Sequence, residues 1–259
     1  MTSENGSQAV DRALALLHLF TGPTPSWTLT ELAREAGLTV STTHRILKSL
    51  LAKEFVTVDP RTRRYSVGVE VMRLASTVLE NDATHRLQMV AQEPMERLRA
   101  ASKETVGLHV RIGRSRVCVS ELSSPHPIRM ATTIGGVQPL HAGAASKALL
   151  AWLPAAEWRD LLRDQPLDRL TPLTITALDA LDAELAEVRQ RGYATSYGES
   201  VAGAAALAAP IFGLQGRPMA ALNVTGPLER FDRSAIAATV ADLRTASAEI
   251  SAQLGHVAR

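Results

Sequence analysis

The chain has 259 residues, of which 46% are hydrophobic and 4% aromatic, and its formal net charge is +2. This length and this hydrophobic content are enough to fill two separate cores, so we expect two domains. The single cysteine, Cys118, excludes an internal disulfide and is typical of a reducing compartment.

The first predicted element is an amphipathic helix over residues 10–20. Residues 1–8, which precede it, are polar and lack the basic start and apolar stretch of a secretory signal. A glycine- and proline-rich segment, residues 21–26, is expected to end the helix. The side chains predicted on its buried side are Val10, Ala13, Leu14, Leu17 and Phe20.

Residues 29–53 have the pattern of a helix-turn-helix motif. The first helix is predicted over 29–36, with Thr28 or Thr30 as its N-cap, and Gly37 suits the left-handed backbone of the turn. The second helix is predicted over 40–53. Its core side is expected to carry Thr43, Ile46, Leu47, Leu50 and Leu51. Its outer side is expected to carry Ser41, Thr42, His44, Arg45 and Lys48.

A basic two-stranded hairpin, the wing, is predicted over residues 56–59 and 64–67, with a turn at residues 60–63. Between residues 40 and 66 there are six Lys and Arg against two Asp and Glu, a local balance of +4. Arginines at the turn would contact phosphates or a minor groove. This order of elements indicates a winged helix, although similar motifs also occur in all-helical domains that bind only protein.

The start of the second helix is suited to reading DNA. Short hydroxylated side chains let a helix enter the major groove, and Arg45 has the reach to contact guanine O6 and N7. We therefore predict that the chain binds double-stranded promoter DNA. The predicted contacts are Ser41, Thr42, Thr43, His44, Arg45, Lys48, Arg61, Arg63 and Arg64.

A helix without glycine or proline is predicted over residues 69–79, where it can act as a semi-rigid connector. The change of character near residues 80–82 gives the domain boundary. The predicted organisation is a DNA-binding domain over residues 1–68, a linker helix over 69–82, and a third part over 83–259.

The rest of the chain mixes strands and helices without a βαβ rhythm, which indicates an α+β fold with an antiparallel sheet flanked by helices. A helix that is broken or restarted at Pro94 is expected to run into Ala101. The predicted strands are residues 105–112, 116–122, 128–134, 205–212 and 219–225. The predicted helices are residues 144–153, 155–163, 177–191 and 232–254.

Two of these segments bear on partners. The most apolar stretch, residues 201–212, is too short to span a bilayer, so we expect a soluble cytoplasmic protein without a membrane partner. The closing helix has a seam that could pack on its own sheet or on a second subunit. The seam residues are Ile236, Val240, Leu243, Ser247, Ile250, Leu254 and Val257.

Taken together, residues 10–252 resemble the IclR family of bacterial transcriptional regulators. In the first half the resemblance is carried by VDRALALLHLF at 10–20, LTELAREAGLTVSTTHRILKSLLAKEFV at 29–56 and RRYSVGVEVMRLA at 63–75. In the second half it is carried by HAGAASKALLAWL at 141–153, RGYATSYGES at 191–200, LAAPIF at 207–212 and ALNVTGP at 221–227.

The resemblance implies a winged helix-turn-helix joined to a GAF-like domain that binds a small organic acid or an aromatic metabolite. It also implies dimers or tetramers on promoter DNA. The effector pocket would be lined by Met130, Gln138, Ala144, Ala145, Ser196, Ala204, Ala206, Asn223 and Thr225. Many relatives have glycine before the lysine of the HA…K block, where this chain has Ser146, and this departure leaves the identity of the ligand open.

The residues themselves make such a pocket plausible. Residues 143–145 lie at the start of a predicted helix, where free amides and the helix dipole favour an anion. Asn223 and Thr225 alternate along a predicted strand, so both point to the same side. Small side chains at Ala204 and Ala206 leave room opposite them.

Groups that could suggest catalysis have simpler explanations. His141 and Lys147 could form an acid–base pair, but a histidine before a helix more often satisfies backbone groups. Cys118 on an apolar strand is expected to be a small buried residue. The seven histidines show no spacing typical of a metal site, so we expect no metal, no cofactor and no enzyme activity.

The prediction is a ligand-responsive, sequence-specific DNA-binding transcriptional regulator, and a repressor rather than an activator. Two alternatives stay open. One is an architectural DNA-binding protein that binds no ligand, and the other is an enzyme localised on DNA.

Overall fold

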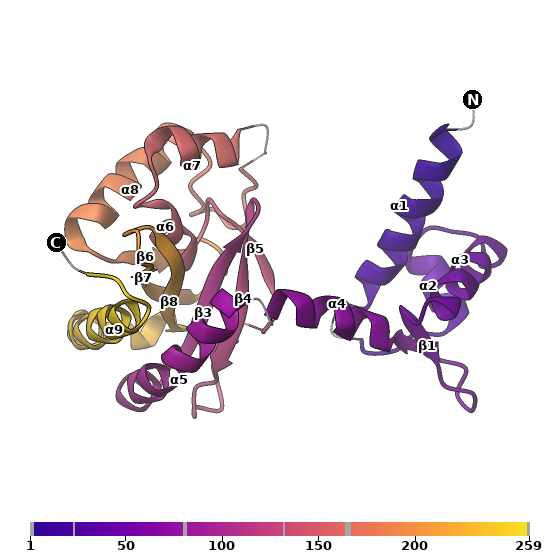
Figure 1. The fold of residues 1–259 in the computed structure, drawn as a ribbon, viewed down its shortest axis with the longest axis horizontal. Helices are drawn as coiled ribbons and strands as arrows, with labels where there is room; N and C mark the ends of the chain where they lie inside the picture. The colour runs from indigo at the N-terminus through magenta and orange to yellow at the C-terminus, as the bar shows by residue number, and fades with distance from the viewer. Residues whose placement is uncertain (1–2, 23, 80–81, 132, 164–166, 258–259) are drawn as a thin grey trace. The chain divides into compact units, whose positions relative to one another are not determined.

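The computed structural model describes residues 3–22, 24–79, 82–131, 133–163 and 167–257. The chain divides into two compact units, Met1–Asn81 and Asp82–Arg259, which are described separately below (Figure 1). Pro23 of the predicted helix-ending segment lies outside the described residues, as do Glu80 and Asn81 at the predicted boundary.

The first unit is a winged helix-turn-helix, as predicted. Its elements are α1 (Ser3–Leu19), α2 (Leu29–Glu35), α3 (Val40–Ala52), β1 (Val56–Val58), β2 (Tyr65–Val67) and α4 (Val69–Leu79). Strands β1 and β2 pair antiparallel and form the wing. A small core is formed by Leu16, Phe20, Leu32, Leu47, Val56 and Tyr65.

The turn between α2 and α3 follows from local chemistry. Thr28, rather than Thr30, is the N-cap of α2, and its side chain and that of Glu31 form a capping box. Gly37 has φ +63, the left-handed conformation that the turn requires. The bounds of α2 and α3 agree with the predicted ranges, 29–36 and 40–53, to within one residue.

The predicted buried side of α1 is wrong in part. Leu16 is fully buried and Phe20 nearly so, whereas Val10 and Leu14 are 57% and 59% exposed. The apolar residues of this helix extend more than halfway round it, so periodicity alone did not fix which of them face α2 and α3.

The second unit contains a six-stranded antiparallel sheet in the order β5-β4-β3-β8-β7-β6. This confirms the predicted α+β architecture. The strands are β3 (Thr105–Ile112), β4 (Ser115–Leu122), β5 (Val137–Pro139), β6 (Ala194–Tyr197), β7 (Ala204–Phe212) and β8 (Pro218–Pro227). The helices are α5 (Asp82–Ser102), α6 (Ala144–Leu150), α7 (Ala155–Leu162), α8 (Leu178–Arg191) and α9 (Arg233–Gln253), with a short 3-10 helix at Leu228–Arg230.

Helices cover both faces of this sheet (Figure 1). One core joins α5 and α9 to one face, with Leu98, Leu222 and Leu243 among its members. The other joins α6, α7 and α8 to the opposite face around Trp158. The seam of α9 therefore packs on the sheet of its own domain, which was one of the two predicted alternatives. Val257 was predicted to belong to this seam, but it lies beyond α9 and is 78% exposed.

Two predictions about this unit are wrong, and two strands were missed. Helix α5 is not broken at Pro94, because Leu87, Ala91, Met95 and Leu98 continue one buried face through the proline. The predicted strand at residues 128–134 is not a strand in its described part. The carbonyl of Met130 accepts a hydrogen bond from Thr105 Oγ1 instead of from a neighbouring strand. Strands β5 and β6 were not predicted.

Candidate functional site

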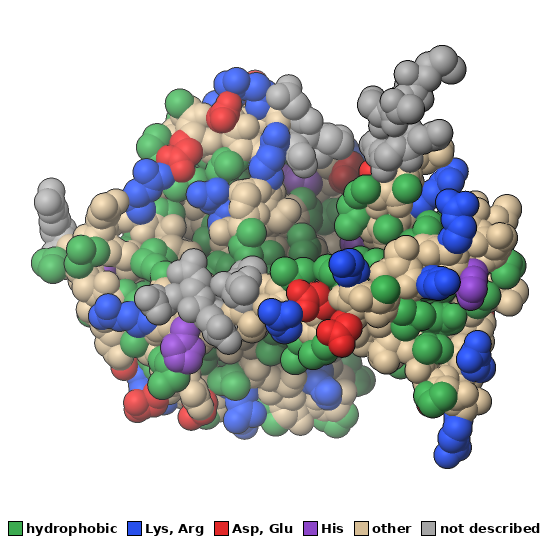
Figure 2. All heavy atoms as spheres, turned by 45° about the vertical axis from the view of Figure 1, so that its right-hand side comes forward, with side chains coloured by type: hydrophobic (Ala, Val, Ile, Leu, Met, Phe, Trp, Pro, Cys, Tyr) green, Lys and Arg blue, Asp and Glu red, His purple; other side chains and the backbone are tan. Residues whose placement is uncertain are grey.

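The first turn of α3 presents a polar, basic surface. Thr39 caps the helix by accepting a hydrogen bond from the amide of Thr42 at 3.2 Å. Four of the residues predicted to contact DNA are exposed, namely Ser41, His44, Arg45 and Lys48, and Thr42 is half-buried. Figure 2 shows Lys and Arg side chains along the outer edge of this unit. Such a surface can contact phosphates and base edges.

Two predicted DNA contacts are corrected by this geometry. Thr43 is fully buried, and its hydroxyl donates to the Thr39 carbonyl at 3.0 Å, so its side chain does not reach a ligand outside the fold. Arg64 is turned toward the body of the unit. Its guanidinium binds Ser26 and pairs with Glu31 at 3.2 Å. Arg64 therefore joins the wing to the start of α2.

The tip of the wing carries the other two arginines. Arg61 and Arg63 are exposed, and Arg63 has φ +55. Asp59 accepts hydrogen bonds from the amides of Arg61 and Thr62, which lower its pKa and hold the turn. The turn thus presents both arginine side chains to solvent.

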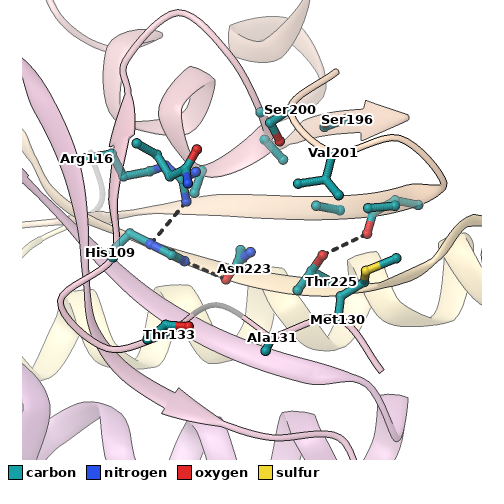
Figure 3. Close-up of a pocket in the computed structure, with 18 residues that line it drawn as sticks. His109, Arg116, Met130, Ala131, Thr133, Ser196, Ser200, Val201, Asn223 and Thr225 are labelled. Carbon is teal, nitrogen blue, oxygen red and sulfur yellow. Dashed lines mark hydrogen bonds between the residues drawn. The ribbon is translucent and has the colours of Figure 1, made fainter. Parts of the chain in front are cut away.

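A cavity of about 240 Å³ lies in the second unit, beside the start of α6 (Figure 3). The structure brings together around it all nine residues predicted to line an effector pocket. They are Met130, Gln138, Ala144, Ala145, Ser196, Ala204, Ala206, Asn223 and Thr225. Their role in binding a ligand stays a prediction.

The sheet explains how these side chains converge. On β8, Leu222 and Val224 belong to the core under α5 and α9, so the intervening Asn223 and the following Thr225 point to the opposite face and line the cavity. Gly107 is paired with Asn223 across β3 and β8. A Cβ at residue 107 would lie 2.5 Å from Asn223 Oδ1, so only glycine leaves room for this side chain.

Sequence reasoning missed the principal charged group of the cavity, Arg116 on β4. Its side chain is 7% exposed. Arg116 Nε donates to Ser146 Oγ at 3.0 Å, and Ser146 donates in turn to the Pro139 carbonyl at 2.9 Å. The signal was available, because Arg116 lies two residues before Cys118, which was predicted to be buried, and side chains two apart share a strand face.

His109 on β3, also missed, connects Arg116 to Asn223. Arg116 Nη1 lies 3.2 Å from His109 Nδ1, and His109 Nε2 lies 3.0 Å from Asn223 Oδ1 (Figure 3). Burial, followed by the charge of Arg116, lowers the pKa of His109 well below its usual value, so the imidazole is neutral at pH 7. Burial lowers the pKa of Arg116 to about 10, so the guanidinium stays charged.

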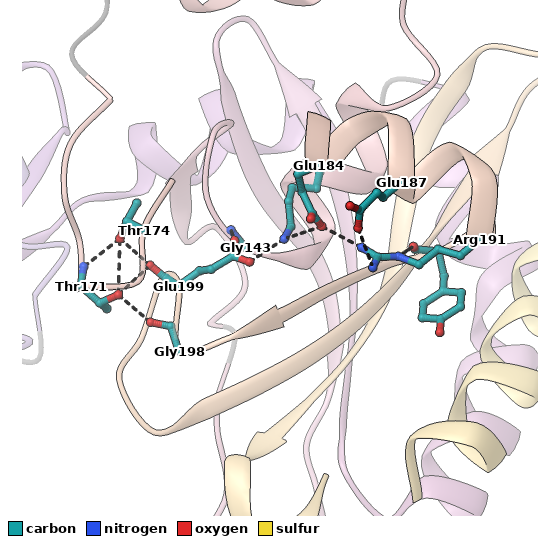
Figure 4. Close-up of polar contacts among 10 residues, drawn as sticks. Gly143, Thr171, Thr174, Glu184, Glu187, Arg191, Gly198 and Glu199 are labelled. Carbon is teal, nitrogen blue, oxygen red and sulfur yellow. Dashed lines mark hydrogen bonds and ion pairs between the residues drawn. The ribbon is translucent and has the colours of Figure 1, made fainter. Parts of the chain in front are cut away.

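An ion-pair network holds the loop that follows β6 against α6 and α8 (Figure 4). Lys147 is 1% exposed and lies 2.5 Å from Glu199 and 3.1 Å from Glu184. Thr174 donates to the Glu199 carbonyl at 2.7 Å. Two residues of this loop, Ser200 and Val201, line the cavity, so the network fixes part of its wall.

The groups that could suggest catalysis are engaged structurally. His141 Nε2 lies 3.0 Å from the Asp168 carbonyl, and Lys147 pairs with glutamates. Burial raises the pKa of the Cys118 thiol to about 11, which keeps it protonated at pH 7. Within the described ranges, no group of three His, Cys, Asp or Glu could hold a metal ion. No described helix is both long enough and apolar enough to cross a membrane.

Comparison with known proteins gives the family. Residues 82–252 match the model of the bacterial transcriptional regulator IclR C-terminal domain, and residues 9–60 match the IclR helix-turn-helix domain. The chain is 30% identical over 254 residues to the HTH-type transcriptional repressor AllR of Klebsiella pneumoniae, covering 98% of this chain and 92% of that protein. For AllR of Escherichia coli K12 the identity is 29% over 253 residues, with the same coverage.

Solved structures agree along nearly the whole length. The IclR protein of Thermotoga maritima superposes with a TM-score of 0.77 at 26% identity, covering 96% of this chain and 100% of that one. An IclR homologue from Microbacterium hydrocarbonoxydans, solved in complex with 4-hydroxybenzoate, gives a TM-score of 0.75 at 27% identity and covers 95% of this chain and 98% of that one. The chain belongs to the IclR family of bacterial transcriptional regulators.

Proposed function

We propose that this regulator is a repressor that binds operator DNA through its winged helix and responds to a small organic acid or aromatic metabolite held in the cavity of residues 82–259. The observation that carries the proposal is that one chain combines an exposed helix start rich in hydroxyl and basic groups with a separate domain that encloses a cavity. The relatives named AllR are repressors, and a homologue of known structure binds 4-hydroxybenzoate.

The proposed DNA contacts are the predicted residues that reach solvent, apart from Arg64, which is ion-paired to Glu31: Ser41, Thr42, His44, Arg45, Lys48, Arg61 and Arg63. Arg45 is assigned to a base edge, because it lies one turn into α3 and its fork suits guanine. Arg61 and Arg63 at the wing are assigned to the phosphate backbone. DNA binding places the protein on the bacterial chromosome in the cytoplasm.

We also propose that the active form is a homo-oligomer, a dimer or a tetramer. One winged helix makes few contacts, so two would engage half-sites about one helical turn, or a multiple of it, apart. Exposed apolar side chains support this proposal. In α4, Val69 and Met72 are 57% and 70% exposed, and an isolated helix of this length is marginal in water without a partner surface.

The test is a titration of the full chain against the DNA upstream of its own gene at several salt concentrations. With about six phosphate contacts per dimer, log affinity should fall with log salt with a slope near −5. A salt-insensitive curve contradicts the assignment. Calorimetry with a panel of organic acids then separates the alternatives, because an architectural protein binds none of them and an enzyme consumes one.

A further inference from the structure

Arg116 is a buried cation that lines the cavity. Its guanidinium binds Ser146 and His109, both neutral, and pairs with no acidic side chain in the described part of the chain. The nearby Cys118 thiol is protonated at pH 7, because burial raises its pKa to about 11. A buried charge without a counter-charge is costly, and a bound anion removes that cost.

The hydrogen-bond directions around Arg116 are fixed by chemistry. A guanidinium can only donate, so His109 Nδ1 must accept, and the neutral ring then carries its proton on Nε2. Nε2 therefore donates to Asn223 Oδ1, and the amide nitrogen of Asn223 has no acceptor among the described residues. Arg116 Nη2 likewise has no acceptor in the part of the chain that the structure describes. This wall of the cavity presents donors only, so it suits a ligand group that only accepts.

The rest of the cavity is small and largely apolar. Met130 and Val201 lie away from Arg116 in Figure 3, and Ala204 and Ala206 add short side chains to the lining. A cavity of about 240 Å³ lies below the usual range of about 300–1,000 Å³ for drug-sized ligands. One charged end and one short apolar body describe a small monocarboxylic acid.

We propose that the effector is a small monocarboxylate whose carboxyl group is held by Arg116 Nη2 and the Asn223 amide, and that Ser146 positions Arg116 for this contact. This inference rests on the proposed function in one respect, that the cavity is the effector site. Ser146 is fully buried with both hydrogen bonds made. The serine therefore holds the Arg116 guanidinium at a fixed position beside the cavity.

The experiment is calorimetry on the full chain with acetate, pyruvate, benzoate and 4-hydroxybenzoate, each paired with its amide, and with inorganic phosphate. The amide keeps the shape of the acid but has no charge and donates where the acid accepts. We expect at least one acid to bind, and its amide to bind at least about 30-fold more weakly, because one buried charge pair is lost.

Arg116→Gln should reduce the preference for the acid over its amide to about one. The matched control is Arg111→Gln, because Arg111 lies directly opposite Arg116 in the strand register but is exposed, with its guanidinium on the Gly113 carbonyl. The Arg111→Gln variant should bind the acid and its amide with the affinities of the unchanged protein. Circular dichroism of Arg116→Gln shows whether the variant folds. Arg116→Lys keeps the charge but lacks the two parallel N–H donors of a guanidinium, so its preference for the acid over the amide should be intermediate.

Ser146→Ala tests the positioning role. Loss of one neutral hydrogen bond should lower the acid-to-amide preference by about 2- to 10-fold while leaving the amide affinity unchanged, which a merely structural defect would not do.

The proposal is overturned if acid and amide bind equally, if Arg116→Gln keeps the preference, or if phosphate alone or nothing in the panel binds. These results are distinct from failure of the proposed function. An acid that binds with the expected preference but leaves DNA affinity unchanged contradicts regulation and keeps the carboxylate assignment.

Discussion

At the scale of single residues, the protein separates two kinds of arginine. Arg45 and the wing arginines are exposed and available to DNA, whereas Arg64 and Arg116 are held by protein groups at fixed positions. Composition does not distinguish these roles, since all five are arginines. The arginines differ in their hydrogen-bond partners within the protein. Substitution of an exposed arginine should therefore change DNA binding, whereas substitution of one held by protein groups should change the structure around it.

Arg45→Ala should cost about 1–3 kcal/mol of specific binding and relax the preference at one base position, because it removes a bidentate contact to a base edge. Arg61→Ala should instead weaken binding to all sequences alike. A fluorescence titration over single-base variants of the operator measures both. Uniform weakening by Arg45→Ala would show that Arg45 contacts phosphate.

His109 should make stability depend on pH. Its pKa in the folded state is lowered by burial and by Arg116, whereas in the unfolded chain it has the ordinary value of about 6.5. As pH falls below that value, His109 becomes protonated in the unfolded chain but stays neutral in the folded chain. The contribution of His109 to the free energy of unfolding is therefore fully present above about pH 6.5 and is lost as pH falls below it.

The urea midpoint of the full chain, measured between pH 5 and 7.5, should therefore drop on the acid side. His109→Gln should flatten the curve in this window. An unchanged slope in that variant would mean that another group is responsible.

At the scale of elements, the sequence predicted best where local chemistry decides the outcome. The capping box at Thr28 and Glu31, the turn at Gly37 and the connector α4 over residues 69–79 needed no information from elsewhere in the chain. The alternation of Asn223 and Thr225 placed part of the cavity for the same reason.

Where distant segments compete, prediction from sequence failed. Pro94 does not break α5, because packing against the sheet outweighs one lost hydrogen bond. Ile128 reads as a strand residue but is 77% exposed, since its segment has no neighbouring strand. Arg116 was missed because an arginine is ordinarily taken to be solvated, although its spacing from Cys118 placed it on the buried face that the register of β3, β4 and β5 encloses.

The network around Lys147 joins α6, α8 and the loop after β6. Lys147→Met should lower the free energy of unfolding by about 3 kcal/mol, because it leaves Glu199 partly buried without its cation, whereas Glu184 keeps its ion pair with Arg191. Lys53→Met, at an exposed lysine, should change it little. Equal losses in urea unfolding of the two variants would show that the network contributes no stability.

Helix α4 is the connector through which the ligand signal should pass. Insertion of two glycines within residues 69–79 should abolish the effect of ligand on DNA binding while leaving ligand affinity intact, because glycine removes the stiffness of the helix. Calorimetry and DNA titration on the same variant measure the two properties. A ligand response that survives the insertion rules out α4 as the connector.

At the scale of the whole molecule, regulation requires that ligand and DNA favour different states of one oligomer. Coupling of about 1–3 kcal/mol between the sites corresponds to a 5- to 150-fold change in DNA affinity. The same coupling must appear in the other direction, so DNA should change ligand affinity by the same factor. Reciprocity of this kind separates an allosteric regulator from a protein that binds DNA and a metabolite independently.

The most direct measurement is the affinity of the full chain for the DNA upstream of its own gene, by fluorescence anisotropy at modest salt, with and without a carboxylate that calorimetry shows to bind. The account predicts sequence-specific binding that the carboxylate weakens by at least about 5-fold. Failure to prefer that DNA over random duplex, in both the presence and the absence of the carboxylate, would contradict it.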